Sequence, residues 1–430
     1  MATATPDTPL SRGVGKLTGG WLGFVGAMLV LVAVGAYAYS REVSEGMILT
    51  GMRDVGTMGG ATWGLYISFV VYFVGVSFAG ITTAAVIRIF NLNRLRPLAR
   101  MAEVVTVVSL VLAALAIIAD LGQPLRGIVN LFRYARPQSP FFGTFTLVVA
   151  GYLWASVVYL WLTSRSDAAV LARQPTRLQW LHRLVAAGYR DTPAERERHS
   201  RATFWLAIAI LPMLVIAHST LGFVFGLQVG RPGWYSALQA PAFVVLAGVS
   251  GIGALIVLAA IVRKMIGREV GLDMYVFGWL GRVLLVLLLA YAYFMVTELL
   301  TATYAGGARE RAVTRAMLWG DYSWVFWSSV ALLAVPLVAL MEQALTRRWT
   351  VAWLVASGIA VNLGAIGKRY LITVPSQTHG TLLPYVEGSY APTWIELAVV
   401  GGLLALGALL IGMYMKVLPI VELEEEEVHA

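Results

Sequence analysis

The chain has 430 residues, of which 59% are hydrophobic and 13% are charged, and it contains no cysteine. Soluble domains carry about 25% charged residues, so this composition indicates a protein that crosses a membrane several times. The missing cysteines exclude disulfides, iron–sulfur clusters, thiolate zinc sites and haem attached through cysteine. The formal net charge of +9 does not indicate nucleic-acid binding, because the basic residues lie between apolar stretches and suit topology signals beside lipid headgroups.

Ten apolar stretches are long enough to span a bilayer, which takes about 20 residues. The first is similar to a signal peptide, with a positive start and AYA at 36–38, but we expect a retained helix. We predict an all-α membrane protein in which spans two to five and six to nine form two four-helix bundles, flanked by spans one and ten. In chain order the spans are 21–39, 62–87, 101–119, 142–163, 203–226, 242–263, 273–301, 321–345, 348–367 and 394–417.

The distribution of Lys and Arg predicts the orientation of these spans. The N-terminus, the C-terminus and the loops after spans two, four, six and eight carry 20 of these residues, and the opposite loops carry 11. The positive-inside rule then places both termini in the cytoplasm, and the membrane we expect is the inner, cytoplasmic one. The largest cytoplasmic loop, about 164–202, holds eight arginines.

Two spans resemble each other and suggest an internal repeat. Span two contains GVSFAGITTAAVIR and span six contains GVSGIGALIVLAAIVR. Both run in the same direction four helices apart, as in parallel repeats, although small residues that favour close packing also produce chance similarity. We expect four domains: 1–61 with the tail, span one and an external loop, 62–226 and 227–367 as the two bundles, and 368–430 with an external loop, span ten and an acidic tail.

Polar residues gather in the external third of the predicted membrane. An ionisable side chain at this depth is costly and marks a functional site. A quinone headgroup would need hydrogen bonds from His or Tyr and carboxylates that carry protons, but a proton relay would use the same residue types. Taken one at a time, each of these residues also has an ordinary explanation, as the end of a helix or as a side chain that extends its polar group to the membrane surface. The set consists of Asp120, His218, Tyr291, Tyr293, Glu298, Asn362, Lys368, Arg369 and Glu396.

His218 is the only one of the five histidines that falls within a predicted span. A haem held by two histidines needs two at membrane depth, so we expect no haem. The same lack of ligands argues against a metal centre.

Several stretches, in their order and spacing, resemble the NrfD/PsrC (polysulfide reductase membrane subunit) family. The resemblance is closest to its ten-helix branch, with the hydrogenase-2 membrane subunit and the quinol-oxidising subunits of alternative complex III. The stretches are GVSFAG (75–80), ADLGQP (119–124), HSTLGFVFGLQVGRPGWYSALQAPAF (218–243), YAYFMVTELLTATYAG (291–306), VNLGAIGKRYLITVPS, SYAPTWIE and KVLPIVELEEEE.

The resemblance implies a membrane subunit of a respiratory or photosynthetic oxidoreductase complex, with no enzyme activity of its own outside that complex. It would exchange electrons between membrane quinone or quinol (menaquinone or ubiquinone) and an iron–sulfur subunit docked on the periplasmic face, with or without proton translocation. The chain itself would hold no haem and no iron–sulfur cluster. The alternative is a proton-translocating or purely structural anchor without its own quinone site.

By motif, the resemblance assigns the quinone chemistry to His218 and Asp120. We place Ser77 and Arg126 in the same binding site, although some relatives carry a histidine where this chain has Ser77. The expected proton path lies in the second bundle. It consists of Tyr293 and Glu298 in the external part of span seven, with Arg282, Glu342 and Asp273 on the inner side.

Overall fold

The computed structural model describes residues 13–422 except 53–60, 135, 137, 139–144, 176, 268–270 and 380–387. In this part of the chain all regular elements are helical, and ten helices are long and apolar enough to cross a membrane. The predicted all-α class and the ten spans are thereby confirmed. The ten helices are α1 (Gly19–Glu45), α2 (Leu65–Ile89), α3 (Arg96–Asp120), α5 (Phe145–Leu171), α7 (Pro193–Gly226), α8 (Gln239–Ile266), α9 (Met274–Leu300), α11 (Ser323–Thr346), α12 (Val351–Thr373) and α14 (Trp394–Val417).

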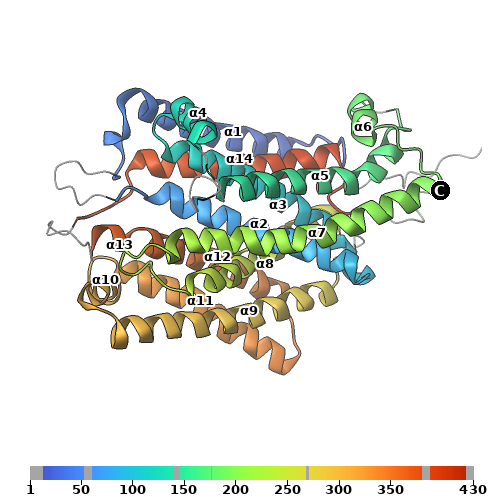
Figure 1. Ribbon diagram of the computed structural model, residues 1–430. Helices are drawn as coiled ribbons and strands as arrows, with labels where there is room; N and C mark the ends of the chain where they lie inside the picture. The colour runs from blue at the N-terminus through green and yellow to red at the C-terminus, as the bar shows by residue number, and fades with distance from the viewer. Residues whose placement is uncertain are drawn as a thin grey trace, which may run out of the picture.

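Four short helices lie at the two ends of this bundle (Figure 1). α4 (Pro124–Tyr134), α10 (Ala308–Leu318) and α13 (Pro375–Thr378) lie at one end, and α6 (Gln179–Ala186) lies at the other. We call the end with α6 the inner end, because the Lys and Arg count predicts that it faces the cytoplasm. The end with α10 is the outer end.

α7 begins ten residues before the predicted start of its span, 203. Thr192 caps the helix by accepting from the Glu195 N–H, the Glu195 side chain returns the capping bond, and Pro193 occupies the first turn. This capping box and an N-terminal proline are strong start signals. The polar segment ERERHSR therefore continues the helix beyond the apolar stretch, and hydropathy does not register such an extension.

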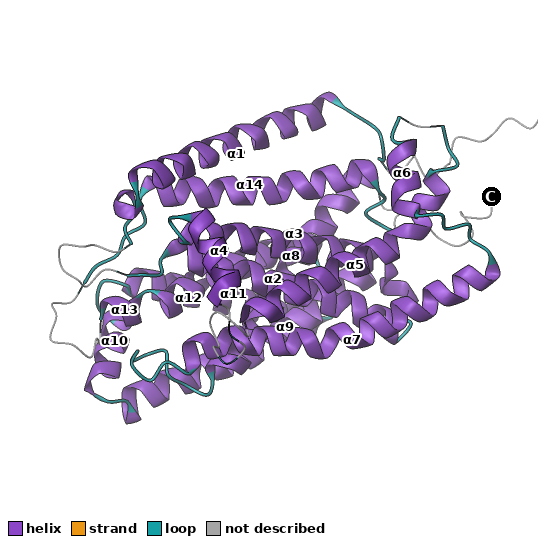
Figure 2. Cartoon of the chain, turned by 45° about the horizontal axis from the view of Figure 1, so that its top comes forward, coloured by secondary structure: helices purple, strands orange, loops and turns teal. Residues whose placement is uncertain are grey.

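The long helices pack in two groups of four. α2, α3, α5 and α7 contact one another in a ring, and α8, α9, α11 and α12 form a second ring. Contacts of α8 with α2 and α7, and of α12 with α2, join the rings. α1 lies along α14, which in turn packs on α3 (Figure 2). This is the predicted arrangement of two bundles and two flanking helices, whereas the residue limits of the four domains stay a prediction.

The two repeated stretches face each other at the centre of the molecule. A Cβ atom on Gly251 of α8 would lie 2.4 Å from the Ala79 Cβ and 2.7 Å from the Val76 carbonyl oxygen of α2. A Cβ on Gly75 would lie 3.5 Å from the Ala247 Cα. Small residues permit this close approach of two helices in a membrane, so the small residues of both copies of the repeat build the interface between the bundles.

Candidate functional site

His218 lies inside the first bundle and is only 1% exposed. Its Nε2 is 2.7 Å from the Val74 carbonyl oxygen of α2, and its Nδ1 is 3.0 Å from the Leu214 carbonyl oxygen in its own helix. The edge of the ring meets Phe78, with 4.6 Å between ring centroids. A neutral imidazole donates one hydrogen bond, whereas the imidazolium donates two. Each ring nitrogen therefore faces a carbonyl acceptor, and only a protonated ring can donate to both.

Ser77, which the sequence places in the same predicted site, lies beside His218. Its hydroxyl donates to the same Val74 carbonyl oxygen, at 2.6 Å. The carbonyl of Ser77 accepts from the Tyr152 hydroxyl of α5 at 3.0 Å and from the Thr106 hydroxyl of α3 at 3.1 Å. Side chains from all four helices of the first bundle thus meet at two carbonyls of α2, those of Val74 and Ser77.

Asp120 and Arg126 lie closer to the outer end than His218 does. Asp120 is buried at the last residue of α3, next to α1, whose Tyr39 hydroxyl donates to the Ile118 carbonyl at 3.3 Å. His218 precedes the end of α7 by eight residues, roughly 12 Å of helix, and its hydrogen bonds do not include Asp120. Arg126 is exposed on α4. Their roles stay predictions.

A second polar cluster lies at the outer end between α1, α2 and α14. The fully buried Glu42 carboxylate accepts from the Tyr66 hydroxyl at 2.6 Å. The Tyr390 hydroxyl donates to the buried Glu396 carboxylate at 2.5 Å, and Glu396 also accepts from the Gly51 N–H at 2.8 Å. Burial and the Glu396 carboxylate raise the pKa of Tyr390. Sequence reasoning missed Glu42, because the predicted first span stopped before it.

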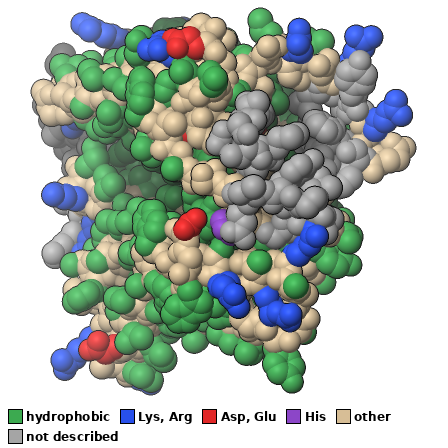
Figure 3. Space-filling view, turned by 90° about the vertical axis from the view of Figure 1, so that its left-hand side faces the viewer, with side chains coloured by type: hydrophobic (Ala, Val, Ile, Leu, Met, Phe, Trp, Pro, Cys, Tyr) green, Lys and Arg blue, Asp and Glu red, His purple; other side chains and the backbone are tan. Residues whose placement is uncertain are grey.

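Figure 3 shows the surface at the outer end, where Lys, Arg, Asp and Glu side chains are scattered among hydrophobic ones. The cluster of Glu42, Tyr66, Tyr390 and Glu396 lies beneath this surface, since three of its members are fully buried and Tyr390 is nearly so. It is a hydrogen-bonded carboxyl–tyrosine network at the end to which Asp120 also belongs.

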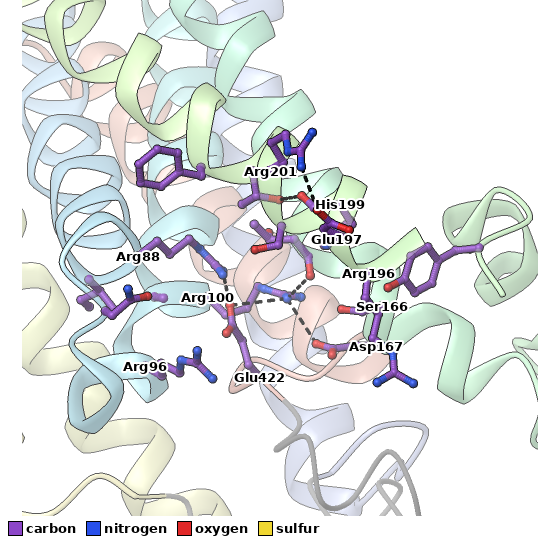
Figure 4. A pocket seen from close by; sticks show the side chains of 18 of the residues that line it. Arg88, Arg96, Arg100, Ser166, Asp167, Arg196, Glu197, His199, Arg201 and Glu422 are labelled. Carbon is purple, nitrogen blue, oxygen red and sulfur yellow. Dashed lines mark hydrogen bonds and ion pairs between the residues drawn. The ribbon is translucent and has the colours of Figure 1, made fainter. Parts of the chain in front are cut away.

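The inner end of the first bundle holds an ionic cluster that sequence reasoning missed (Figure 4). Arg100 is 1% exposed and lies 3.4 Å from Glu103 and 3.2 Å from Asp167 of α5. Arg88 of α2 pairs with Glu103 at 2.9 Å and also with Glu422, which follows α14. A cavity of about 750 Å³ opens beside these side chains.

None of the charged residues of this cluster belongs to the polar set predicted for the external third of the membrane. Arg88 and Arg100 border predicted spans and belong to the residues counted for the orientation, whereas Glu103 lies inside a predicted span. An acid inside a span, near arginines at the ends of neighbouring spans, is the signal that could have found it.

A polar stripe on α5 connects this cluster with the surroundings of His218. Its five residues are spaced three or four apart, so they share one helix face, and each is at most 4% exposed. Asp167 and Thr163 reach the inner cluster, where the Thr163 hydroxyl donates to Glu103 at 2.5 Å. Tyr152, at the other end, lies 6.1 Å from the His218 ring. The stripe consists of Tyr152, Ser156, Tyr159, Thr163 and Asp167.

The five residues of the expected proton path are spread around the second bundle. Glu298 accepts from the Gln239 amide at 3.2 Å, near the outer end, while the Tyr293 side chain is 68% exposed. Arg282 and Glu342 are exposed near the inner end. Among the described residues these five make no hydrogen bond to one another, so the path through the second bundle stays a prediction.

Asp273, the fifth residue of the expected proton path, caps a helix and forms an ion pair. Its carboxylate caps α9 by accepting from the Val276 N–H at 3.0 Å, and it pairs with Arg94 at 2.9 Å. Burial alone would raise the pKa of Asp273, but Arg94 and the Val276 N–H hold it below its usual range. The exposed pair links the ends of α3 and α9.

Comparison with known proteins places this arrangement in a family. The family model described as Polysulphide reductase, NrfD matches residues 54–379. A putative dimethyl sulfoxide reductase membrane subunit of Halobacterium salinarum is 32% identical over 97% of this chain and 94% of its own length. An Hdr-like menaquinol oxidoreductase integral membrane subunit of Archaeoglobus fulgidus is 23% identical over 91% and 92%. The menaquinone reductase integral membrane subunit of Nitratidesulfovibrio vulgaris is 23% identical over 94% and 92%.

Proposed function

Because the chain belongs to the polysulphide reductase NrfD family, we propose that it is the quinone-reactive membrane subunit of a multisubunit oxidoreductase complex. The observation that carries the proposal is His218, held between two backbone carbonyls inside the first bundle and bordered by Ser77 and Tyr152. The names of two relatives, a menaquinol oxidoreductase and a menaquinone reductase subunit, support menaquinone or a related quinone as the substrate.

The partner in this proposal carries the iron–sulfur clusters. The chain has no cysteine to hold one, so long-range electron transfer needs a second protein. The partner docks at the outer end, which the Lys and Arg count assigns to the periplasmic face of the inner membrane, with both termini in the cytoplasm. Asp120, Glu42 and Glu396 lie at this same end.

Protons accompany the two electrons that a quinone accepts or releases. His218 carries one of these protons, since each of its ring nitrogens faces a carbonyl acceptor and only a protonated ring donates at both. The α5 stripe supplies the proton from the inner cavity, because Asp167 and Thr163 reach the inner cluster and Tyr152 borders His218. Asp120 closes the site toward the outer end and positions the headgroup.

Quinol turnover by the purified complex tests this assignment. His218→Gln keeps a donor for the Val74 carbonyl but cannot carry a proton, so it should lower turnover about 100-fold or more, as expected for loss of an acid–base group. His218→Ala should match it, and Asp120→Asn should be milder. Tyr37→Phe, at an exposed position of α1, is the control and should leave turnover unchanged.

The alternative function is a proton-translocating or structural anchor without its own quinone site. It predicts full quinol turnover in His218→Gln and Asp120→Asn when the complex assembles normally. That outcome would remove His218 and Asp120 from the quinone site.

A further inference from the structure

The segment 172–190, which contains α6, is strongly basic. It includes four arginines and no Asp or Glu. All four are exposed, and none forms an ion pair with a described residue. The following segment differs, because there Arg196 pairs with Asp191 at 3.0 Å and Arg201 pairs with Glu197 at 2.8 Å. The unpaired arginines are Arg173, Arg177, Arg183 and Arg190.

One face of α6 is fixed to the rest of the molecule. The His182 ring nitrogen lies 2.8 Å from the Val417 carbonyl oxygen at the end of α14. The Trp161 indole of α5 donates to the Val185 carbonyl at 3.0 Å, and the Arg165 guanidinium donates to the Ala186 carbonyl at 2.9 Å. These contacts hold α6 in one orientation at the inner end (Figure 1).

The opposite face of α6 carries large apolar side chains that no other part of the described chain covers. Trp180 is 65% exposed and Leu184 is 67% exposed. They are four residues apart, so they lie on the same side of the helix, and the exposed Arg183 lies next to Leu184. A helix with tryptophan and leucine on one side and arginines around it is typical of helices that lie in a membrane interface.

The contacts of α6 also define its depth. Trp161 and Arg165 stand where the apolar stretch of α5 gives way to polar sequence, SRSD at 164–167. The end of a membrane-spanning apolar stretch lies at the level of the lipid headgroups. α6 is bonded to these two residues, so its exposed face lies at headgroup depth.

We propose that α6 and its four unpaired arginines form a binding surface for anionic phospholipid headgroups at the inner end, with Trp180 and Leu184 inserted among the lipids. The phosphate of the lipid pairs with arginines that have no carboxylate partner within the described chain. Basic residues next to spans bind anionic lipid surfaces in this way. This surface is independent of the proposed quinone site.

Because the chain has no native cysteine, one introduced cysteine can be labelled selectively. Leu184→Cys introduces a single reactive thiol, which can carry an environment-sensitive fluorophore. The full chain is reconstituted in nanodiscs of phosphatidylcholine alone or of phosphatidylcholine with phosphatidylglycerol. With phosphatidylglycerol, we expect the emission to shift to the blue and the label to be protected from acrylamide, a neutral quencher dissolved in water.

Two double variants separate the charge effect from folding. Arg177→Gln with Arg183→Gln should abolish most of the effect of phosphatidylglycerol, with the ratio of docked to free label falling on the order of fivefold for each arginine removed. Arg196→Gln with Arg201→Gln removes arginines already paired with acids and should leave the effect intact. Thermal unfolding confirms that each variant is folded.

Three outcomes would overturn the proposal. The label could be equally open to acrylamide in both kinds of nanodisc, or the effect of phosphatidylglycerol could survive in the Arg177→Gln and Arg183→Gln variant. Protection only in the presence of the other subunits of the complex would assign this surface to a protein partner.

Discussion

The two four-helix bundles follow the same packing plan but differ in what they bury. α5 and α11 are each the third helix of their bundle, yet their inward faces are unlike. α5 buries the polar stripe from Tyr152 to Asp167, whereas α11 buries mainly apolar residues such as Leu333 and Leu340. Polar groups inside a membrane are costly unless they are hydrogen-bonded or serve a function. The buried polar face of α5 therefore supports the proposal that the quinone chemistry lies in the first bundle.

The largest loss of stability should come from removing Arg100, the central side chain of the buried ionic cluster in the first bundle. Arg100→Ala removes the buried cation that lies between the Glu103 and Asp167 carboxylates, and of its two arginines Glu103 keeps only Arg88. Breaking a buried pair in this way costs about 3–5 kcal/mol, so the variant should unfold well below the temperature of the parent. Thermal unfolding in detergent measures the change.

Arg94→Ala is the matched control for this variant. Arg94 pairs with Asp273, but both side chains are largely exposed, and such a pair contributes about 1 kcal/mol or less. Equal effects of the two substitutions would contradict the view that the cluster is held together by buried charge.

The next largest loss of stability should come from overpacking the interface between the two bundles, where α2 contacts α8. Gly251→Leu places a side chain where even a Cβ would lie 2.4 Å from the Ala79 Cβ. Overpacking of this kind costs about 1–3 kcal/mol, and unfolding followed by circular dichroism should detect it. Gly401→Leu, on α14, has no neighbouring atom within 4 Å of its Cβ position and should be almost neutral. An unaffected Gly251→Leu variant would contradict the close contact of α2 and α8.

A smaller change, in quinol turnover, should distinguish a proton path along the α5 stripe from one through the second bundle. Tyr159→Phe removes one hydroxyl from the α5 stripe and keeps the buried ring. We expect quinol turnover to fall by about tenfold, less than the loss of a direct acid–base group. If Glu298→Gln lowers turnover while Tyr159→Phe does not, the path runs through the second bundle after all.

The fold was largely readable from the sequence, because apolar length determines where a chain crosses a bilayer. All ten spans were found, and the limits of α14, 394–417, agree at both ends. The start of α7 was missed because its first turns are polar and depend on the cap at Thr192. Hydropathy detects the apolar part of a helix that crosses the membrane, but it does not detect polar turns that continue the helix outside the bilayer.

The site was only partly readable, for a different physical reason. His218 can be singled out from the sequence because a histidine inside an apolar run is rare, and the structure buries it. Arg88, Arg100 and Asp167 stood at the ends of spans, where charges usually face water. Which of them turn inward depends on how α2, α3 and α5 are rotated against one another, and a single sequence does not contain that rotation.

Photo-cross-linking can show whether quinone reacts in the first bundle beside His218. A photoreactive quinone analogue is bound to the active complex and illuminated, and the labelled peptides are identified by mass spectrometry, with excess natural quinol as the competitor. We expect competable labelling of α2, α3 or α7 near Ser77, Asp120 and His218. Competable labelling confined to α9, α11 or α12 would contradict it.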